Sequence, residues 1–391
     1  MSQLSLELAS ESLGEFFDNI ALSREKNTLT HGLHPYPAKF IPHIPRALIA
    51  AYAIPEEPVL DPMCGSGTTL VEAAVAGYEA LGVDLNPIAV LATRAKTTVL
   101  TRSSRASLQE LAVRCFAESE HYSNNRKLLN SAVSDSALPS FHRRERWFND
   151  HVSRELVLIK RRIIDLPTEQ ARTFAECAFS AVLVTVSNQE SETRWCTKPN
   201  DIPVGATLAV YARRLLSSLA REMQYAEANP AHSRVLLGDA RNTGFESESV
   251  GLVVTSPPYA NSHDYYLYNK LRMFWLGFDV RSVQTAEIGS RHRHSDRKED
   301  VAVYLLEMRD VIREMYRVLR RGRKAVLVVA DAVIRGELHS MRELITPLAE
   351  EVGFQAMESF EFAHKSFNST FQKGFGSAIK KKTHVLVFDR S

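Results

Sequence analysis

The sequence contains little cysteine and no long apolar run. Its four cysteines, Cys64, Cys115, Cys177 and Cys196, are far apart and form no Cys-x-x-Cys pair, so neither a zinc site nor a disulfide framework is predicted. We therefore expect a reducing compartment and no metal. No apolar run approaches the length that spans a bilayer, and the first residues are acidic where a signal peptide needs bases. Neither export nor membrane insertion is expected.

The sequence also lacks a strong excess of charge of either sign. Its 48 Lys and Arg residues against 46 Asp and Glu give a formal net charge of +2. Global charge therefore argues neither for nor against nucleic acid, and local clusters must carry that argument. With 391 residues, 45% hydrophobic and 24% charged, the composition is that of an ordinary globular protein with one large domain or two moderate ones.

The most informative stretch is 59–86, which predicts a strand, a glycine turn, a helix and a second strand ending in an acid. Gly65 and Gly67 allow the backbone to approach a ligand closely, although a Gly-x-Gly turn alone often binds nothing. Asp84 follows at the spacing, roughly 20 residues, of a carboxylate that binds ribose hydroxyls. Asp61 precedes the turn and would meet a positively charged group, which favours a sulfonium amino acid over a pyrophosphate.

A second motif follows the apolar strand predicted at 249–255. Ser256 and Pro257 could accept hydrogen bonds from an exocyclic amine through their hydroxyl and carbonyl oxygens, and Tyr259 could stack on a base. Pro257 and Pro258 fix the backbone and donate no hydrogen bonds. The alternative is a proline turn that merely ends a strand.

Together the two motifs resemble the S-adenosylmethionine-dependent amino-methyltransferases of DNA. The usual cofactor motif of that family is Asp-Pro-Phe-x-Gly-Ser-Gly-Thr-Thr, and here Met63 replaces the Phe. Ser in the first position of Ser-Pro-Pro-Tyr is usual in the cytosine-N4 subgroup, whereas Asp is more usual for adenine N6 and Asn for protein glutamine or guanine N2. The resemblance covers about residues 31–98 and 233–390.

The resemblance implies a set of site residues. The catalytic residues would be Ser256, Pro257, Pro258 and Tyr259. The residues that bind S-adenosylmethionine would be Tyr36, Ala38, Lys39, Asp61, Met63, Cys64, Gly65, Gly67, Thr68, Thr69, Asp84, Asn86, Asp239 and Ala240. Asp239 would bind the adenine amine. Within the proline-rich segment 31–49, Tyr36 to Phe40 would fold over the methionine end of the cofactor. The alternative is a rigid lead-in segment, but the position relative to Asp61 favours contact with the cofactor.

The expected fold is α/β, a doubly wound, mostly parallel sheet of the class I methyltransferase (Rossmann-like) type, ending in an antiparallel pair of strands. We expect the cofactor-binding half in 1–99, a helical insertion in 100–232 that is a candidate for DNA recognition, and the second half of the catalytic domain in 233–391. Helices are predicted at 108–117, 152–164, 171–186 and 206–225.

Several polar segments of this insertion and of later loops are candidates for nucleic-acid contact. Arginines and aromatics mix in 141–148, and 160–162 is Lys-Arg-Arg; both could contact phosphates or form solvated helix faces. Residues 188–195 are expected to form a polar loop that reaches base edges. The segment 261–298 is a further candidate for sequence recognition. Its basic, His-rich end 288–298 favours phosphate contact over a metal site, and the Lys-containing loop 365–382 could hold the DNA backbone or be a solvated loop.

The predicted function is methyl transfer from S-adenosylmethionine to the N4 amine of cytosine flipped out of double-stranded DNA. The alternatives are adenine N6 at the same site, an RNA base, and a DNA-binding protein without turnover. We expect a cytoplasmic, nucleoid-associated enzyme. No nuclease motif is evident, so a restriction endonuclease partner would be a separate chain. The sequence leaves the recognition site and the oligomeric state open.

Overall fold

The structure is a computed structural model that describes residues 13–19, 28–123, 125–260, 264–290, 300–334, 337–363 and 381–391. Residues 261–263 and most of the two predicted basic loops, 288–298 and 365–382, lie outside the described residues. No helix within the described ranges is long and apolar enough to cross a membrane.

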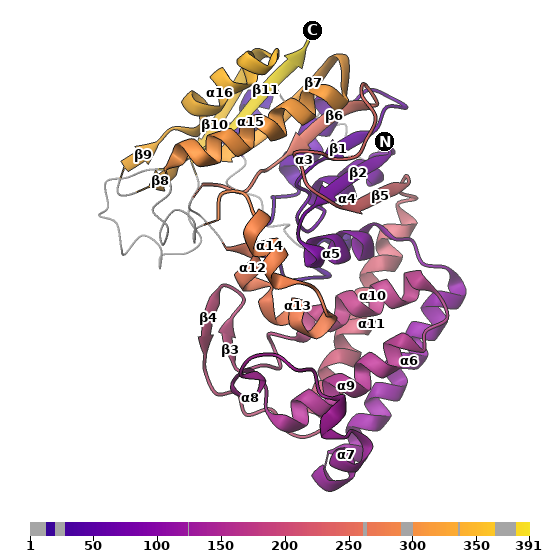
Figure 1. Ribbon diagram of the computed structural model, residues 1–391. Helices are drawn as coiled ribbons and strands as arrows, with labels where there is room; N and C mark the ends of the chain where they lie inside the picture. Colours follow the sequence, from indigo (N-terminus) through magenta and orange to yellow (C-terminus); the bar gives the residue numbers. More distant parts are fainter. Residues whose placement is uncertain are drawn as a thin grey trace.

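A seven-stranded sheet forms the centre of the molecule, in the order β10-β11-β7-β6-β1-β2-β5 (Figure 1). Its strands are β1 (Val59–Asp61), β2 (Ala80–Asp84), β5 (Ser233–Leu237), β6 (Val250–Thr255), β7 (Leu319–Ala330), β10 (Gln355–Ala363) and β11 (Lys382–Arg390). All neighbours pair in parallel except that β11 runs antiparallel to both β7 and β10. The predicted doubly wound sheet of the class I methyltransferase type is therefore confirmed.

Helices cover both faces of this sheet and bury its apolar side chains. On one face pack α15 (Val301–Val318) and α16 (Met341–Val352), and on the other α2 (Leu13–Asn19), α3 (His43–Tyr52) and α4 (Thr68–Val75). The central strand β6 is buried along its whole length, which explains its uninterrupted apolar sequence. Each such buried side chain stabilises the fold by about 1.5–3 kcal/mol.

Helix α5 (Pro87–Thr97) was not predicted, because the interpretation ended the first half-sheet at Asp84. The Asn86 side chain accepts a hydrogen bond from the Ile88 amide at 3.0 Å and caps this helix, and Pro87 occupies its first turn. Almost every α5 residue is buried, since the helix lies between the sheet and the insertion. No one-sided apolar pattern marks it in the sequence.

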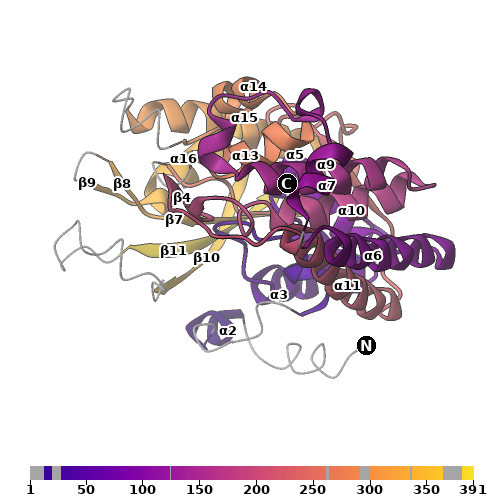
Figure 2. The same ribbon diagram turned by 90° about the horizontal axis from the view of Figure 1, so that it is seen from below.

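The insertion between β2 and β5 has its own apolar core, formed by α6 (Arg102–Tyr122), α7 (Arg126–Ala132), α8 (Arg144–Trp147), α9 (Asp150–Ile164), α10 (Glu169–Val182) and α11 (Ala206–Glu227). Helices α6 and α11 pack along each other, as Figure 2 shows. The predicted polar loop 188–195 is wrong, because most of it forms a hairpin of β3 (Gln189–Ser191) and β4 (Arg194–Thr197).

Short elements after β6 connect the sheet to the insertion. They are α12 (Tyr265–Tyr268), α13 (Lys270–Leu276) and α14 (Val280–Ala286), and a small hairpin of β8 (Ala332–Ile334) and β9 (Glu337–His339) follows β7. Two short 3₁₀ helices, η2 (Leu29–Gly32) and η3 (Asp135–Ala137), complete the described elements. Leu271 and Trp275 of α13 belong to the apolar core of the insertion, so α13 joins the two parts.

Candidate active site

The carboxyl ends of three neighbouring strands bring the two sequence motifs together. Asp61 ends β1 and Asp84 ends β2, while Ser256 follows β6 on the other side of β1. Because these strands are parallel, all of their carboxyl ends meet at one edge of the sheet. The strand order reverses between β1 and β6, which is where ligands of doubly wound sheets bind.

The glycine turn between β1 and α4 is supported from below by α5. Gly67 has a φ of 80°, and a Cβ atom there would lie 2.6 Å from Cγ2 of Thr93, so only glycine fits. The Thr93 hydroxyl donates to the Gly65 carbonyl at 2.9 Å, and the buried Lys96 ammonium donates to the Ser66 carbonyl at 2.7 Å. Helix α5 therefore sets the shape of the turn.

Asp61 connects the two motifs through hydrogen bonds. Thr69 of α4 donates to Oδ2 at 2.7 Å, and Thr255 of β6 donates to Oδ1 at 2.7 Å. The Met63 amide also donates to Oδ1 at 3.2 Å. Burial raises the pKa of Asp61 to about 6, although these hydrogen bonds oppose the effect. The carboxylate therefore fixes the glycine turn relative to Ser-Pro-Pro-Tyr.

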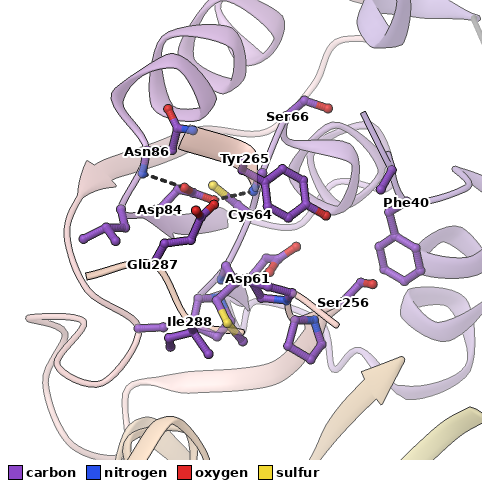
Figure 3. Close-up of a pocket in the computed structure, with 18 of the residues that line it drawn as sticks. Phe40, Asp61, Cys64, Ser66, Asp84, Asn86, Ser256, Tyr265, Glu287 and Ile288 are labelled. Carbon is purple, nitrogen blue, oxygen red and sulfur yellow. Dashed lines mark hydrogen bonds between the residues drawn. The ribbon is translucent and has the colours of Figure 1, made fainter. Parts of the chain in front are cut away.

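Asp84 lies on the other side of the turn with both oxygens oriented by backbone amides. Gly65 donates to Oδ2 and Asn86 donates to Oδ1, each at 2.8 Å (Figure 3). Burial raises the pKa of Asp84 to about 6. Each carboxylate oxygen retains a lone pair, so Asp84 can still accept two hydroxyl groups of a ribose.

One pocket contains nearly all of the predicted site residues. They line a hollow that is partly open to solvent and that encloses, open solvent included, about 1000 Å³ of empty space. The predicted residues that line it are Tyr36, Ala38, Lys39, Asp61, Met63, Cys64, Gly65, Thr68, Thr69, Asp84, Asn86, Asp239, Ala240, Ser256, Pro257, Pro258 and Tyr259. Gly67 does not line the pocket; its role is to shape the turn.

The Ser-Pro-Pro-Tyr segment forms one wall of this pocket. The Ser256 hydroxyl lies 3.3 Å from the Tyr259 hydroxyl, and either can be the donor. Burial raises the pKa of Tyr259. The phenol therefore stays neutral and keeps its hydroxyl proton, which it can share with Ser256.

The proline-rich segment forms part of the opposite wall. Tyr36 stacks on Tyr265, with ring centroids 5.9 Å apart and planes inclined by 16°. The Lys39 ammonium donates to the His31 carbonyl at 3.1 Å, and the His31 ring lies 2.7 Å from the Glu72 carboxylate of α4. The contact between His31 and Glu72 therefore links the proline-rich segment to α4, the helix that follows the glycine turn.

Asp239 lines the pocket but has a competing partner. The Arg241 guanidinium donates to both carboxylate oxygens, at 2.9 Å and 2.6 Å, and the Arg241 amide donates to Oδ1. Burial would raise the pKa of Asp239, but these hydrogen bonds outweigh burial and lower it. An adenine amine at this position would therefore share the carboxylate with Arg241.

Outside the two motifs and the proline-rich segment, five residues that line the pocket were not among the predicted site residues: Tyr265, Val283, Ala286, Glu287 and Ile288. Glu287 is almost fully buried and points toward Asp84 in Figure 3. Burial raises its pKa well above the usual range, and the neighbouring Asp264 and Asp84 raise it further. These residues come from α12, α14 and the segment after α14, and no motif marks them in the sequence.

The basic residues 160–162 of α9 do not form a free cationic face. The Lys160 ammonium donates to the Trp275 carbonyl at 2.6 Å, Arg161 donates to the Ala132 carbonyl, and Arg162 pairs with Glu118 at 2.7 Å. These side chains support the fold of the insertion. Among the described residues, no three His, Cys, Asp or Glu side chains gather as a metal site requires.

Comparisons with known proteins point to one group of enzymes. A family model described as DNA methylase matches residues 5–94. The type II methyltransferase M.MvaI of Kocuria varians is 28% identical over 66% of this chain, and the match spans 60% of that relative's length. M.MjaII of Methanocaldococcus jannaschii is 21% identical over 79% of this chain and 73% of its own length. M.BsoBI of Geobacillus stearothermophilus is 20% identical over 95% of this chain and 87% of its own length.

Proposed function

The family model and the three relatives support membership of the S-adenosylmethionine-dependent amino-methyltransferases of DNA, and from this premise we propose a specific reaction. The enzyme transfers a methyl group from S-adenosylmethionine to the exocyclic amine of a base flipped out of double-stranded DNA. Cytosine N4 is the favoured acceptor, because Ser256 occupies the first position of Ser-Pro-Pro-Tyr.

The observation that carries this proposal is the hydrogen bond from Thr255 to Asp61, at 2.7 Å, between the two motifs. It holds the start of the glycine turn and the start of Ser-Pro-Pro-Tyr side by side at one edge of the sheet. A cofactor on the first motif and an amine on the second would then lie within reach of each other.

In this proposal Asp84 accepts the ribose hydroxyls, and Asp61 contributes negative charge near the sulfonium. The Ser256 hydroxyl and the Pro257 carbonyl accept hydrogen bonds from the amine, which turns its lone pair out of conjugation and toward the methyl group. The amine nitrogen forms a bond to the methyl carbon as the carbon–sulfur bond breaks, and the proton leaves to water. Orientation and fixed dipoles provide the catalysis, without a covalent intermediate.

The substrate assignment also favours a DNA-recognition role for the insertion. Double-stranded DNA as partner and association with the nucleoid follow from the same proposal. A restriction endonuclease on a separate chain stays a prediction.

The first test is mass spectrometry of nucleosides from DNA treated with the protein and S-adenosylmethionine. We expect N4-methylcytosine. N6-methyladenine would keep the mechanism and overturn the base assignment. No methylated nucleoside from any DNA would overturn the proposed function, and would favour an RNA base or binding without turnover.

Ser256→Ala tests the catalytic assignment. The variant loses one acceptor for the amine, so we expect kcat to fall by about 100-fold with unchanged cofactor affinity. Ser249→Ala is the matched control, because Ser249 precedes the opposite end of the same strand and its hydroxyl bonds only the Glu246 carbonyl. Equal methylation rates for the two variants would contradict the role of Ser256.

A further inference from the structure

The β3–β4 hairpin lies close to the pocket, although about 60 residues separate it from Ser-Pro-Pro-Tyr in the sequence. Strand β4 contacts α12, which contributes Tyr265 to the pocket. Figure 1 shows the hairpin beside α12 and α13. The Glu192 carboxylate in the turn of the hairpin also acts electrostatically on Lys39 of the pocket wall. Whatever binds the hairpin would therefore lie next to the pocket.

A buried arginine holds this hairpin in place. Arg272 of α13 is fully buried and donates to Glu192 at 2.6 Å and to the Ser180 carbonyl at 3.0 Å. Its remaining nitrogen donates to the Tyr268 carbonyl. A buried guanidinium with a hydrogen bond from each of its three nitrogens strongly resists movement of its partners. The hairpin is thus fixed relative to the helix that follows the catalytic motif.

Aromatic rings pack beneath and beside the β3–β4 hairpin. Trp195 of β4 packs on the buried Trp147, with ring centroids 4.2 Å apart. The Lys270 ammonium of α13 lies 5.3 Å from the Trp195 ring centroid and 5.9 Å from that of Phe274. These contacts place a lysine charge at the surface with little freedom to move.

Three exposed cations lie on the hairpin or against it: Arg194 in β4, Lys198 directly after β4, and Arg146, which contacts Thr197 of β4. Arg146 donates to the Thr197 hydroxyl at 3.3 Å, and Arg194 pairs with the exposed Glu190 at 3.3 Å. An exposed ion pair of this kind contributes little free energy, so Arg194 can exchange its partner for a phosphate. We call Arg146, Arg194, Trp195, Lys198 and Lys270 the hairpin patch.

We infer that the hairpin patch binds the sugar-phosphate backbone of duplex DNA beside the flipped base. The inference rests on the proposed function, and it deepens that function by naming the surface that positions the duplex. Fixed cations at defined points match the repeated negative charge of DNA, and such contacts set the register of a protein on the duplex. Because the Arg272–Glu192 pair holds the hairpin relative to α13, it would also fix the position of the bound duplex relative to the pocket.

The test compares two triple variants in direct binding to duplex DNA over a range of salt concentrations. The first is Arg146→Gln, Arg194→Gln and Lys198→Gln. The control is Arg114→Gln, Arg313→Gln and Arg321→Gln, which removes the same charge from exposed arginines on α6, α15 and the start of β7. Because each phosphate contact contributes about 0.9 to the salt slope, the patch variant should lose about 2.7.

That loss has a measurable consequence. Between about 50 and about 200 mM salt, the drop in affinity for duplex DNA should be roughly 40-fold smaller for the patch variant than for the native protein. The control variant should keep the native slope, and both should bind S-adenosylmethionine normally.

Three results would overturn the inference. They are an unchanged salt slope in the patch variant, an equal change in both triple variants, and binding through the patch to RNA but not to duplex DNA. The two proposals fail separately: methylation with an unchanged salt slope overturns the patch alone, whereas patch-dependent duplex binding without any methylation overturns only the proposed reaction.

Discussion

Lys96 is a lysine enclosed by protein below the glycine turn. Its side chain is fully buried, and its ammonium donates to the Ser66 carbonyl at 2.7 Å. Burial lowers its pKa well below the usual range, and the positive charge of Lys39 lowers it further. The hydrogen bond restrains the backbone between Gly65 and Gly67. Lys96 is therefore a positioning residue for whatever binds the turn.

Lys96→Met tests this role, because methionine preserves the apolar stem and removes the hydrogen bond. The freed Ser66 carbonyl should let the turn relax, and we expect cofactor affinity to fall about tenfold, the equivalent of one lost hydrogen bond of about 1.4 kcal/mol. Calorimetric titration with S-adenosylmethionine measures it. Lys127→Met on the exposed face of α7 is the control. Equal affinities in the two variants would refute the positioning role.

The site residues within the two motifs could be predicted from the sequence, whereas the residues that contact them in the structure could not. Asp61, Asp84 and Ser256 follow strands directly, so their meeting at one edge follows from parallel topology. Glu287 and Tyr265 come from later segments without a motif, and only packing brings them to the pocket. The same holds for Arg241, whose pairing with Asp239 depends on the local turn.

At the scale of elements, a carboxylate from one helix caps another. Glu155 of α9 is buried and accepts hydrogen bonds from the amides of Gly205 at 2.8 Å and Thr207 at 2.9 Å, at the start of α11. The Leu208 amide donates to it at 3.3 Å. No side chain adjacent in sequence caps this helix, since its N-cap residue is Gly205. A distant carboxylate performs the function that a local serine or aspartate usually performs.

Glu155→Ala should leave these buried amides without an acceptor and lower the free energy of unfolding by about 1–3 kcal/mol. Urea-induced unfolding measures it. Glu110→Ala on the exposed face of α6 is the matched control and should change the free energy by less than about 0.5 kcal/mol. If both variants unfold alike, α11 does not depend on this cap.

The helices of the insertion were predictable because most carry one apolar face, and α9, α10 and α11 occupy nearly the predicted ranges. Helix α5 was missed because nearly all of its residues are buried. The hairpin was missed because its strands are short and polar, and the Arg272–Glu192 pair that holds it is distant in sequence. The sequence did contain one signal for α5: Asn86 is a residue type that caps helices, and Pro87 is favoured in a first helical turn.

At the scale of the whole molecule, ligand binding and folding should respond to pH in opposite directions. The folded-state pKa values of Asp61 and Asp84 are about 6, above the usual range for aspartate. The folded protein therefore binds these protons more tightly than the unfolded chain does. The stability that this difference contributes is fully present below the unfolded pKa and is lost as pH rises through about 6.

In the proposed function, cofactor binding requires the same two carboxylates in their ionised form, to accept ribose hydroxyls and to attract the sulfonium. Lowering the pH from about 7.5 to about 5 should therefore weaken S-adenosylmethionine binding by up to about tenfold for each carboxylate. Together they would remove as much as about 2.7 kcal/mol of ligand-induced stabilisation. The Tm gain is the Tm with cofactor minus the Tm without it at the same pH. This difference removes the effect of groups whose pKa does not change when the cofactor binds.

The measurement is the Tm gain with saturating S-adenosylmethionine across this pH range, with two comparisons that separate the carboxylates. Asp84→Asn should lower the gain at neutral pH and reduce its pH dependence, because one titrating acceptor is gone. S-adenosylhomocysteine keeps the ribose but has no sulfonium, so its binding should depend on Asp84 and much less on the charge of Asp61. A gain that does not change with pH would mean that neither carboxylate contacts the cofactor in ionised form, and Asp61 would then serve only to join β1, α4 and β6.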